Sequence, residues 1–382
     1  MIELAEIVRH AGEAYRRTFG DRMPPSHARA LGDILACRTP ALGGSLFACD
    51  DDCGHLEFAY HSCRNRHCPK CHRDDTRRWL DRLRGRLLPC PYYFATFTLP
   101  AELRPLARSH QRIVYDLLLR EAAEALQRLA DDPRWVGGTL GILAVLHTWA
   151  RDLAYHPHVH LLVTAGGLTP DGEAWRKPAH RRFLVPGHAL SEIFRAKMRD
   201  GLQRAGLLDG LDPGIFRKPW TVHLQHAGDG HHAAEYLSRY VHRVALTNDR
   251  LEAFDGERVT FRYISSRTGE TRRLTLPVHA FLARFLQHVL PKGFPKIRSY
   301  GLLSPAAGGR RERARELLAL DPAAPPHPSN PSPPQPAEDQ PPRRPRPCPA
   351  CRHGRLVRLV CFHTPIPLAA TAITGNSRAP PS

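Results

Sequence analysis

Cysteine spacing near the N-terminus is the feature that most restricts how this chain can fold. Six of the ten cysteines fall between Cys37 and Cys71, in the stretch CRTPALGGSLFACDDDCGHLEFAYHSCRNRHCPKC. Close cysteine pairs in a reducing compartment indicate metal ligation before disulfides. Cys49 with Cys53, and Cys68 with Cys71, form two such pairs, separated by a hairpin-length insert. Four thiolates arranged in this way can surround one zinc ion tetrahedrally.

The ligand set has alternatives. Cys63, Cys37 and His67 are further candidates, so a second site or a variant set using Cys63 or Cys37 is open. Buried cysteines that bind no metal are the competing interpretation. A small zinc-binding domain is predicted over residues 24–88, after an amphipathic N-terminal helix over residues 1–23. The later pair CPAC, at positions 348 and 351, supplies only half of a site.

The cellular compartment is inferred from two features that the sequence lacks, a bilayer-spanning segment and a signal peptide. No apolar run is long enough to span a bilayer. The N-terminal stretch MIELAEIVRHAGEAYRRTFGDRM has no uninterrupted apolar segment of the signal-peptide kind. We therefore expect a cytoplasmic protein with reduced thiols and no membrane partner.

A strong excess of positive charge favours a polyanionic partner. Lys and Arg number 55 against 37 Asp and Glu, which gives a formal net charge of +18. Such a balance disfavours a metabolic enzyme and favours DNA. A solvated basic face without a partner is the alternative. The candidate phosphate contacts are Arg64, Arg66, Lys70, Arg239 and Arg243.

Apolar and aromatic patterns predict an α+β fold with a central antiparallel sheet flanked by helices. Strands are expected at 92–98, 141–149 and 158–164, and a long amphipathic helix at 101–131. They lie in a predicted catalytic domain over residues 89–305.

Further elements complete this prediction. A strand is expected at 220–225, a helix from about residue 233, and a hairpin over 258–276 around Thr268-Gly269. Residues 306–347 are assigned to a disordered proline-rich linker, and residues 348–382 to a cysteine-containing tail.

The segment YHPHVHLLV carries a candidate metal site. Side chains alternate across a strand, so His158 and His160 share one face and can chelate a divalent cation. A third ligand is needed, and His147 on the preceding strand is the first choice, with His242 the second. His156 has the same parity but precedes Pro157 and is secondary. Two histidines on a solvated sheet face are the competing interpretation.

The segment AAEYLSRYVHR places Tyr236 and Tyr240 one helical turn apart. A core-facing aromatic stripe is the alternative, but the flanking Arg239 and Arg243 make the surface polar for a core helix. With a histidine-bound cation to polarise a phosphate, these tyrosines are candidate nucleophiles for phosphoryl transfer. Attack would leave DNA covalently attached to the enzyme.

Residues 25–305 resemble the insertion-sequence transposases of the two-tyrosine HUH type, which move by a rolling-circle route. The resemblance rests on motifs in a fixed order: CRTPALGG, YHSCRNRHCPKC, FTLPAELRPL, VLHTW, HPHVHLLVTAGGL, YLSRYVHRVALTNDR and LPKGFPKIRSYGLL. The proline-rich segment and the last residues match nothing in that pattern.

The resemblance implies specific roles. The family's metal motif falls on His158-Val159-His160, its paired catalytic tyrosines on Tyr236 and Tyr240, and its zinc-binding region on the segment 37–71. It implies an HUH endonuclease-like sheet and Mg²⁺ or Mn²⁺ as the catalytic ion, with structural Zn²⁺ elsewhere. It also implies that single-stranded element ends are nicked and rejoined through a 5′-phosphotyrosine.

Two other functions compete with this interpretation. A non-catalytic, zinc-dependent DNA-binding protein would use the cysteines and the basic surface but not the histidines or tyrosines. A relaxase or replication initiator would share the chemistry but serve another process.

Overall fold

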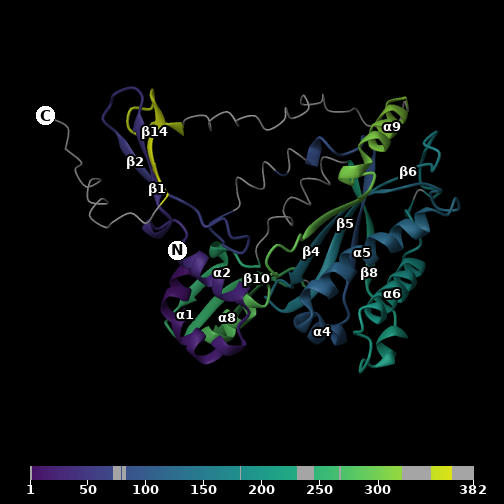
Figure 1. The fold of residues 1–382 in the computed structure, drawn as a ribbon, viewed down its shortest axis with the longest axis horizontal. Coiled ribbons are helices and arrows are strands. Elements are labelled where there is room, and N and C mark those ends of the chain that lie inside the picture. Colours follow the sequence, from purple (N-terminus) through teal and green to yellow (C-terminus); the bar gives the residue numbers. More distant parts are fainter. Residues whose placement is uncertain are drawn as a thin grey trace.

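The structure is a computed structural model, and it describes residues 2–71, 79, 83–180, 182–229, 245–265, 268–320 and 346–363. Over these residues it is a mixed α and β fold (Figure 1). All of its strand pairs are antiparallel, in sheets of five, four, three and two strands. The predicted combination of helices with a central antiparallel sheet is confirmed.

The five-stranded sheet is the centre of the fold. Its strand order is β12-β4-β5-β3-β8, with bounds β3 Pro91–Thr98, β4 Gly141–Trp149, β5 Tyr155–Thr164, β8 Val222–Asp229 and β12 Ile297–Gly301. The predicted strands at 92–98, 141–149 and 158–164 are confirmed. The strand β5 begins earlier than expected, since Pro157 lies inside it.

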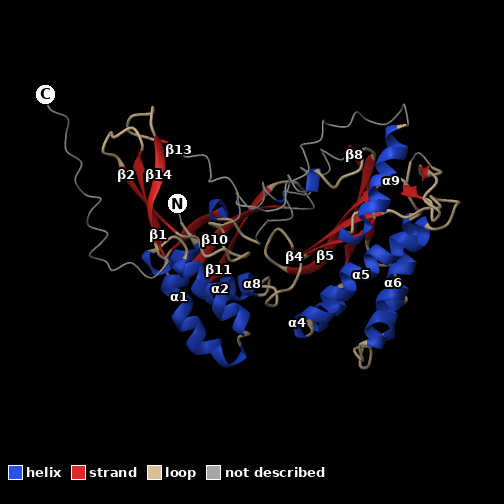
Figure 2. Ribbon diagram, turned by 45° about the horizontal axis from the view of Figure 1, so that its top comes forward, coloured by secondary structure: helices blue, strands red, loops and turns tan. Residues whose placement is uncertain are grey.

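Two helices, α5 (Gln111–Ala130) and α6 (Gly187–Arg204), cover one face of this sheet (Figure 2). The helix α5 contacts β4 and β5, and α6 contacts β8. The single helix predicted over 101–131 is divided, because His110 leaves the helical region with φ −120° and ψ 48°. A short helix, α4 (Arg104–Ser109), precedes that break.

The opposite face of the sheet is covered over one half by α9 (Gly308–Ala319). Ala314 and Leu318 of α9 are buried in a cluster that includes Leu143 and Leu162 of the sheet. The predicted linker over 306–347 therefore begins too early, because this helix packs apolar side chains on the sheet. The rest of the predicted linker, residues 321–345, lies outside the described residues.

A second hydrophobic core combines residues of the N-terminal helices with residues much later in the chain. Leu31 from the N-terminal helices is buried with Phe261 and Phe281, far along the chain. The predicted N-terminal helix and the predicted hairpin are confirmed, and they pack together in this core. The elements of this unit are α1 Leu4–Phe19, α2 Pro25–Ala36, β9 Leu251–Phe254, β10 Arg258–Ile264, β11 Thr271–Pro277 and α8 Val278–Leu286.

The four-stranded sheet pairs strands from the N-terminal and C-terminal regions of the chain. The strand β14 (Arg355–Phe362) pairs with β1 (Gly44–Cys49), which also pairs with β2 (Leu56–Tyr60). A two-residue strand, β13 (Arg346–Pro347), completes the sheet. The C-terminal tail was predicted as a separate unit. Its strand β14 instead pairs with the N-terminal cysteine-rich region (Figure 1).

Short elements connect these units: η1 Gly20–Arg22, η2 Pro40–Leu42, η3 Ala101–Leu103, β6 Gly167–Leu168, β7 Trp175–Arg176, η4 Pro213–Phe216, η5 Asn248–Arg250 and η6 Pro305–Ala307. Among the described residues, no helix combines the length and the apolar character needed to cross a bilayer. The helix predicted from about residue 233 falls outside the described part of the chain.

His288 is a buried histidine where the second core meets the five-stranded sheet. Its Nε2 donates to the carbonyl of Leu153 at 3.1 Å, and its Nδ1 lies 3.3 Å from the Thr148 hydroxyl. Burial lowers the pKa of His288 to about 3. The unfolded chain takes up this proton near pH 6.5, so stability is lost as the pH falls from about 6.5 towards 3.

The variant His288→Gln can keep both hydrogen bonds and does not titrate. We expect the wild type to lose about 2 kcal/mol more unfolding free energy than this variant between pH 7.5 and pH 5. Urea unfolding at the two pH values measures the difference, with His188→Gln on the exposed side of α6 as the control. Equal losses in the wild type and His288→Gln would contradict the assignment.

Candidate metal centres and the histidine cleft

Three histidines meet on the face of the central sheet opposite α5 and α6. His147 on β4 pairs directly with His158 on β5, and His160 follows two residues later on the same face. One ring nitrogen of each lies within 4.8 Å of the other two. The structure thus brings together the two histidines of the motif and the first-choice third one.

Neighbouring groups orient these rings. Nδ1 of His158 lies 2.7 Å from the carbonyl oxygen of His156, and a carbonyl can only accept, so Nδ1 carries the proton. That tautomer leaves the Nε2 lone pair of His158 for a metal, the arrangement usual for ligating histidines. Nδ1 of His160 lies 3.0 Å from the Thr96 hydroxyl. The His147 ring stacks on Trp149 with 4.7 Å between centroids.

Burial keeps the rings of His158 and His160 neutral. Burial lowers the pKa of His158 to about 4, and burial with the neighbouring His158 lowers that of His160 to about 3. Burial and the Arg104 guanidinium, 2.8 Å from Nδ1 of His156, also lower the pKa of His156. A neutral imidazole is the form that binds metals, so these histidines are ready ligands at neutral pH.

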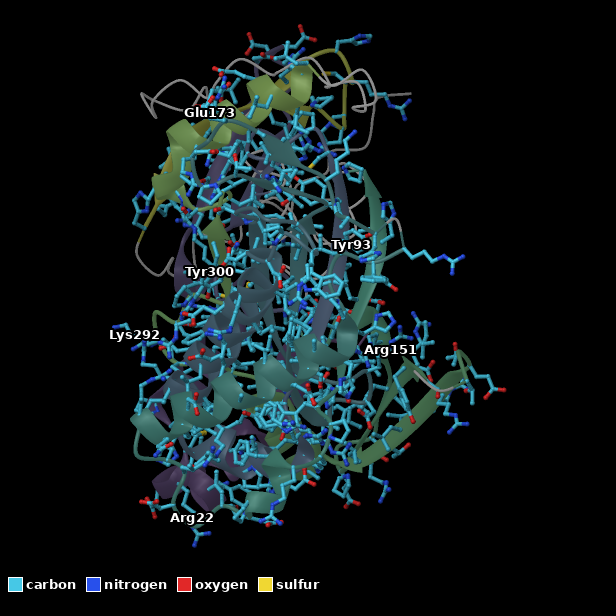
Figure 3. All side chains as sticks on the ribbon, turned by 90° about the vertical axis from the view of Figure 1, so that its right-hand side faces the viewer. Arg22, Tyr93, Arg151, Glu173, Lys292 and Tyr300 are labelled. Carbon is cyan, nitrogen blue, oxygen red and sulfur yellow. The ribbon has the colours of Figure 1, made fainter. Side chains whose placement is uncertain are left out.

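The histidines line a cleft of about 820 Å³ between the central sheet and the β10–β11 hairpin. Its other walls carry Arg151, Arg250 and Arg262, and Asp249 is the one acidic residue among the described residues that line it. Arg262 lies 3.7 Å from Asp249. Arg151 is labelled in Figure 3 beside this hairpin. Cations around a histidine cluster of this kind suit a phosphate-bearing ligand.

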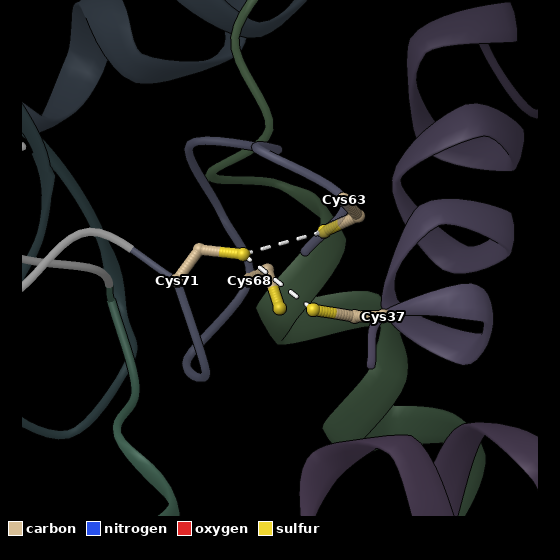
Figure 4. Close-up of side chains that lie close together, drawn as sticks. All are labelled: Cys37, Cys63, Cys68 and Cys71. Carbon is tan, nitrogen blue, oxygen red and sulfur yellow. Dashed lines mark hydrogen bonds between the residues drawn. The ribbon is translucent and has the colours of Figure 1, made fainter. Parts of the chain in front are cut away.

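A first cysteine cluster lies where α2 ends. Cys37 caps that helix, and Cys63, Cys68 and Cys71 follow β2 in a knuckle-shaped turn (Figure 4). The Sγ of Cys71 lies 3.5 Å from that of Cys37 and 3.6 Å from that of Cys63. Zinc–sulfur bonds of ~2.3 Å in a tetrahedron require sulfur separations of about 3.8 Å, so the four sulfurs are close to that geometry.

Proton sharing within this cluster favours a thiolate. Hydrogen bonds from Cys63 and Cys68 lower the pKa of Cys37 to about 2. The same contacts with Cys37 raise the pKa of Cys63 and of Cys68. These contacts favour the thiolate form of Cys37, and a divalent cation would draw protons off the other thiols.

Cys49 and Cys53 do not join Cys68 and Cys71, which corrects the four-thiolate set preferred from spacing. They cluster instead with the C-terminal pair at positions 348 and 351. The reason is the β1–β2 hairpin: Cys49 ends β1, whereas β2 returns to pair with Gly44 at the other end. Six extended residues separate the two ends by about 17 Å, too far for a shared ion.

The predicted DNA contacts differ in their surroundings. Arg64 is exposed. Arg66 is half-buried and donates to the carbonyl of Phe294 at 2.6 Å. Lys70 forms a 2.6 Å ion pair with Glu3. Arg66 and Lys70 thus already fasten the knuckle to neighbouring elements.

The remaining candidates, Tyr236, Tyr240, Arg239, Arg243 and His242, lie outside the described residues. Sequence reasoning missed two arrangements: the union of the two cysteine pairs across the chain, and Arg104 beside His156. The CPAC half-site was a signal for the first, since a half-site needs a partner pair. The second had no signal in the sequence, because the helix α5 and the strand β4 separate Arg104 from His156 along the chain.

Comparison with known proteins supplies the family. Residues 7–99 match the family described as transposase zinc-binding domain, and residues 141–311 match the one described as putative transposase. The chain is 36% identical to putative transposase y4qJ of Sinorhizobium fredii, over 94% of this chain and 95% of that protein. It is 33% identical to the transposase for insertion sequence element IS801 of Pseudomonas savastanoi pv. phaseolicola, over 71% and 68% of the two lengths. No solved structure matches.

A zinc-binding domain followed by a transposase region defines the class of protein. More particularly, this chain belongs to the insertion-sequence transposases of the IS91 family.

Proposed function

We propose that this chain carries out DNA transposition by nicking and rejoining single-stranded DNA, with Tyr236 and Tyr240 as nucleophiles. The observation that carries the proposal is the set of three histidine nitrogens within 4.8 Å of one another in a cleft bordered by arginines. We infer that the central sheet is the HUH endonuclease sheet, because β4 and β5 are adjacent and bring these histidines to one face.

The donor set fits a divalent catalytic ion held by His147, His158 and His160. Three neutral imidazoles on one side leave the other positions for water and phosphate oxygens. The set suits Mn²⁺ better than Mg²⁺, because Mg²⁺ prefers oxygen ligands in a strict octahedron. When bound, such an ion polarises the scissile phosphate and stabilises negative charge that develops on it.

The chain's own groups account for the rest of the chemistry. Arg151 and Arg262 border the cleft and can hold the phosphates on either side of the scissile one. The tyrosine phenol gives its proton to water and attacks phosphorus, forming a tyrosine–phosphate bond. The bond from phosphorus to the 3′ oxygen breaks, and that oxygen takes a proton from water and leaves as a 3′-hydroxyl. Attack by a 3′-hydroxyl on the phosphotyrosine reverses the step and rejoins DNA.

The described chain returns to the cleft just after the tyrosine segment. Nη1 of Arg250, which lines the cleft, donates to the carbonyl of Ala245 at 3.0 Å. Tyr240 precedes Ala245 by five residues, a stretch that spans at most about 18 Å. This connection supports a tyrosine that reaches the histidines, and a pair of tyrosines would allow two attachments in one site.

The first cysteine cluster is proposed as the structural zinc site of this transposase. Cys37, Cys63, Cys68 and Cys71 would hold the ion in a closed tetrahedral site. The knuckle also contacts the segment leading to β12: Nε2 of His67 accepts from the backbone N–H of Leu290 at 3.3 Å. Because β12 pairs with β4, the zinc-binding domain would steady the strand that carries His147.

The double variant Tyr236→Phe/Tyr240→Phe should lose the covalent protein–DNA adduct entirely, because phenylalanine has no hydroxyl to attack phosphorus. The assay uses single-stranded oligonucleotides from the DNA flanking the gene, with Mn²⁺ or Mg²⁺, and detects the adduct on denaturing gels. Tyr60→Phe, on β2 of the four-stranded sheet, is the matched control and should form adduct normally. An undiminished adduct in the double variant would refute the nucleophile assignment.

A further inference from the structure

The turn of the β1–β2 hairpin and the turn between β13 and β14 face each other with two cysteines each. The Sγ atoms of Cys49 and Cys351 are 3.6 Å apart, as are those of Cys53 and Cys348. All four sulfurs lie within 4.8 Å of one another. We propose that they bind a second structural zinc ion, which fastens the C-terminal segment to the N-terminal zinc-binding domain.

Both turns have the backbone form of a metal-binding knuckle. The residue after each second cysteine has a positive φ, 74° at Gly54 and 62° at Arg352. In the C-terminal turn, the N–H of Gly354 donates to the Cys351 sulfur at 3.3 Å and its carbonyl accepts from the N–H of Cys348 at 2.8 Å. Amide donors of this kind stabilise thiolates and hold ligands in place before the metal arrives.

The two turns also fit each other closely. The Arg355 carbonyl accepts from the Asp50 N–H at 2.9 Å, and the Arg355 N–H donates to the Asp50 carboxylate at 2.6 Å. A Cβ added at Gly354 would collide with the Cys49 sulfur and the Asp51 Cβ. Only glycine therefore lets the C-terminal turn approach the first pair of cysteines.

Apolar burial alone is too small to hold this sheet together. Its buried cluster consists of Cys49, Cys348 and Leu356, with Phe47 and Cys351 partly buried against it. Val357, Leu359, Val360 and Phe362 of β14 are exposed. Units with so small a core depend on disulfides or metals for stability. Two of the three core residues are themselves cysteines, so a metal there would supply the missing stabilisation.

Two disulfides are the competing explanation. They would need sulfur separations of ~2.05 Å, in two separate pairs. The sulfurs are instead close to the ~3.8 Å edges of a zinc–thiolate tetrahedron. The site connects residues that are 302 positions apart in the chain. The ion would thus hold the β1–β2 hairpin and the segment that contains β13 and β14 together as one folded unit.

Zinc content tests the proposal. The full-length protein is purified under reducing conditions in a His158→Ala/His160→Ala background, so that the histidine cleft contributes no ion. We expect two zinc ions per chain, and one in Cys348→Ser/Cys351→Ser and in Cys49→Ser/Cys53→Ser. Cys361→Ser, on β14 but outside the cluster, is the matched control and should keep two. Two ions in the Cys348→Ser/Cys351→Ser protein, or one in the control, would overturn the site.

A second measurement uses the wild-type chain with and without zinc and does not depend on the folding of the cysteine variants. A site-specific protease sequence is inserted near residue 333, and the purified, zinc-loaded chain is cut there. The fragment containing β14 should stay bound through size-exclusion chromatography in reducing buffer, and leave after chelation or in the Gly354→Val chain. Retention of the fragment after zinc is removed would overturn the proposal, as would its release from the zinc-loaded wild type.

Discussion

Replacing His158 and His160 together with alanine should abolish DNA cleavage while leaving the protein folded. The proposed ion would lose two of its three ligands, and with them the charge stabilisation it gives the transition state. We expect the cleavage rate to fall at least about 10³-fold, equivalent to about 4 kcal/mol of transition-state stabilisation. Folding should survive, since both rings are desolvated and their removal relieves that cost.

The matched control is His156→Ala, two residues earlier on the same strand. His156 contacts Arg104 and stands outside the three-histidine set. The bond that orients His158 uses the backbone carbonyl of His156, which alanine preserves. Cleavage by this variant should stay within about tenfold of the wild type. Single-turnover cleavage in Mn²⁺ and in Mg²⁺, with DNA affinity by anisotropy, measures both. A double variant that cleaves like the wild type would end the assignment.

The partial success of sequence reasoning at this site has a physical basis. The connection between β4 and β5 is short, with Ala150 and Ala154 joined by a hydrogen bond at 2.9 Å. Adjacent antiparallel strands place a residue of one beside a residue of the other on the same face. A histidine near the end of β4 was therefore expected beside the motif on β5, and the structure pairs His147 with His158.

The sequence could not show which cysteine pairs combine, because the partner pairs lie far apart along the chain. Local spacing shows that Cys49 and Cys53 form a pair, but it does not show which distant strand completes their sheet. The partner strand β14 pairs Leu356 with Cys49, some three hundred residues along the chain. The second core shows the same limit. The sequence of an amphipathic helix shows which face is apolar. It does not show that Phe261 and Phe281 pack against Leu31 on that face.

Disrupting the first cysteine cluster should destabilise far more of the molecule than disrupting the second. Cys37 and Cys68 are buried within the core that also holds α1, α2, α8 and the three-stranded sheet. Loss of the ion would leave unpaired polar groups inside that core and free the knuckle that joins it to Phe294. For Cys68→Ser/Cys71→Ser we expect a loss of several kcal/mol and a melting temperature lower by about 10 °C or more.

The comparison with Cys348→Ser/Cys351→Ser makes this expectation specific. That variant removes support only from the four-stranded sheet, whose buried cluster has three residues, so the main transition should move by about 2 °C or less. Scanning calorimetry with zinc, and again after chelation, measures both variants, with Cys361→Ser as the control. The large shift should appear in the chelated wild type as well, because the ion and not the sulfurs supplies the stability. Equal shifts in the two double variants would show that the second core does not depend on the first cluster.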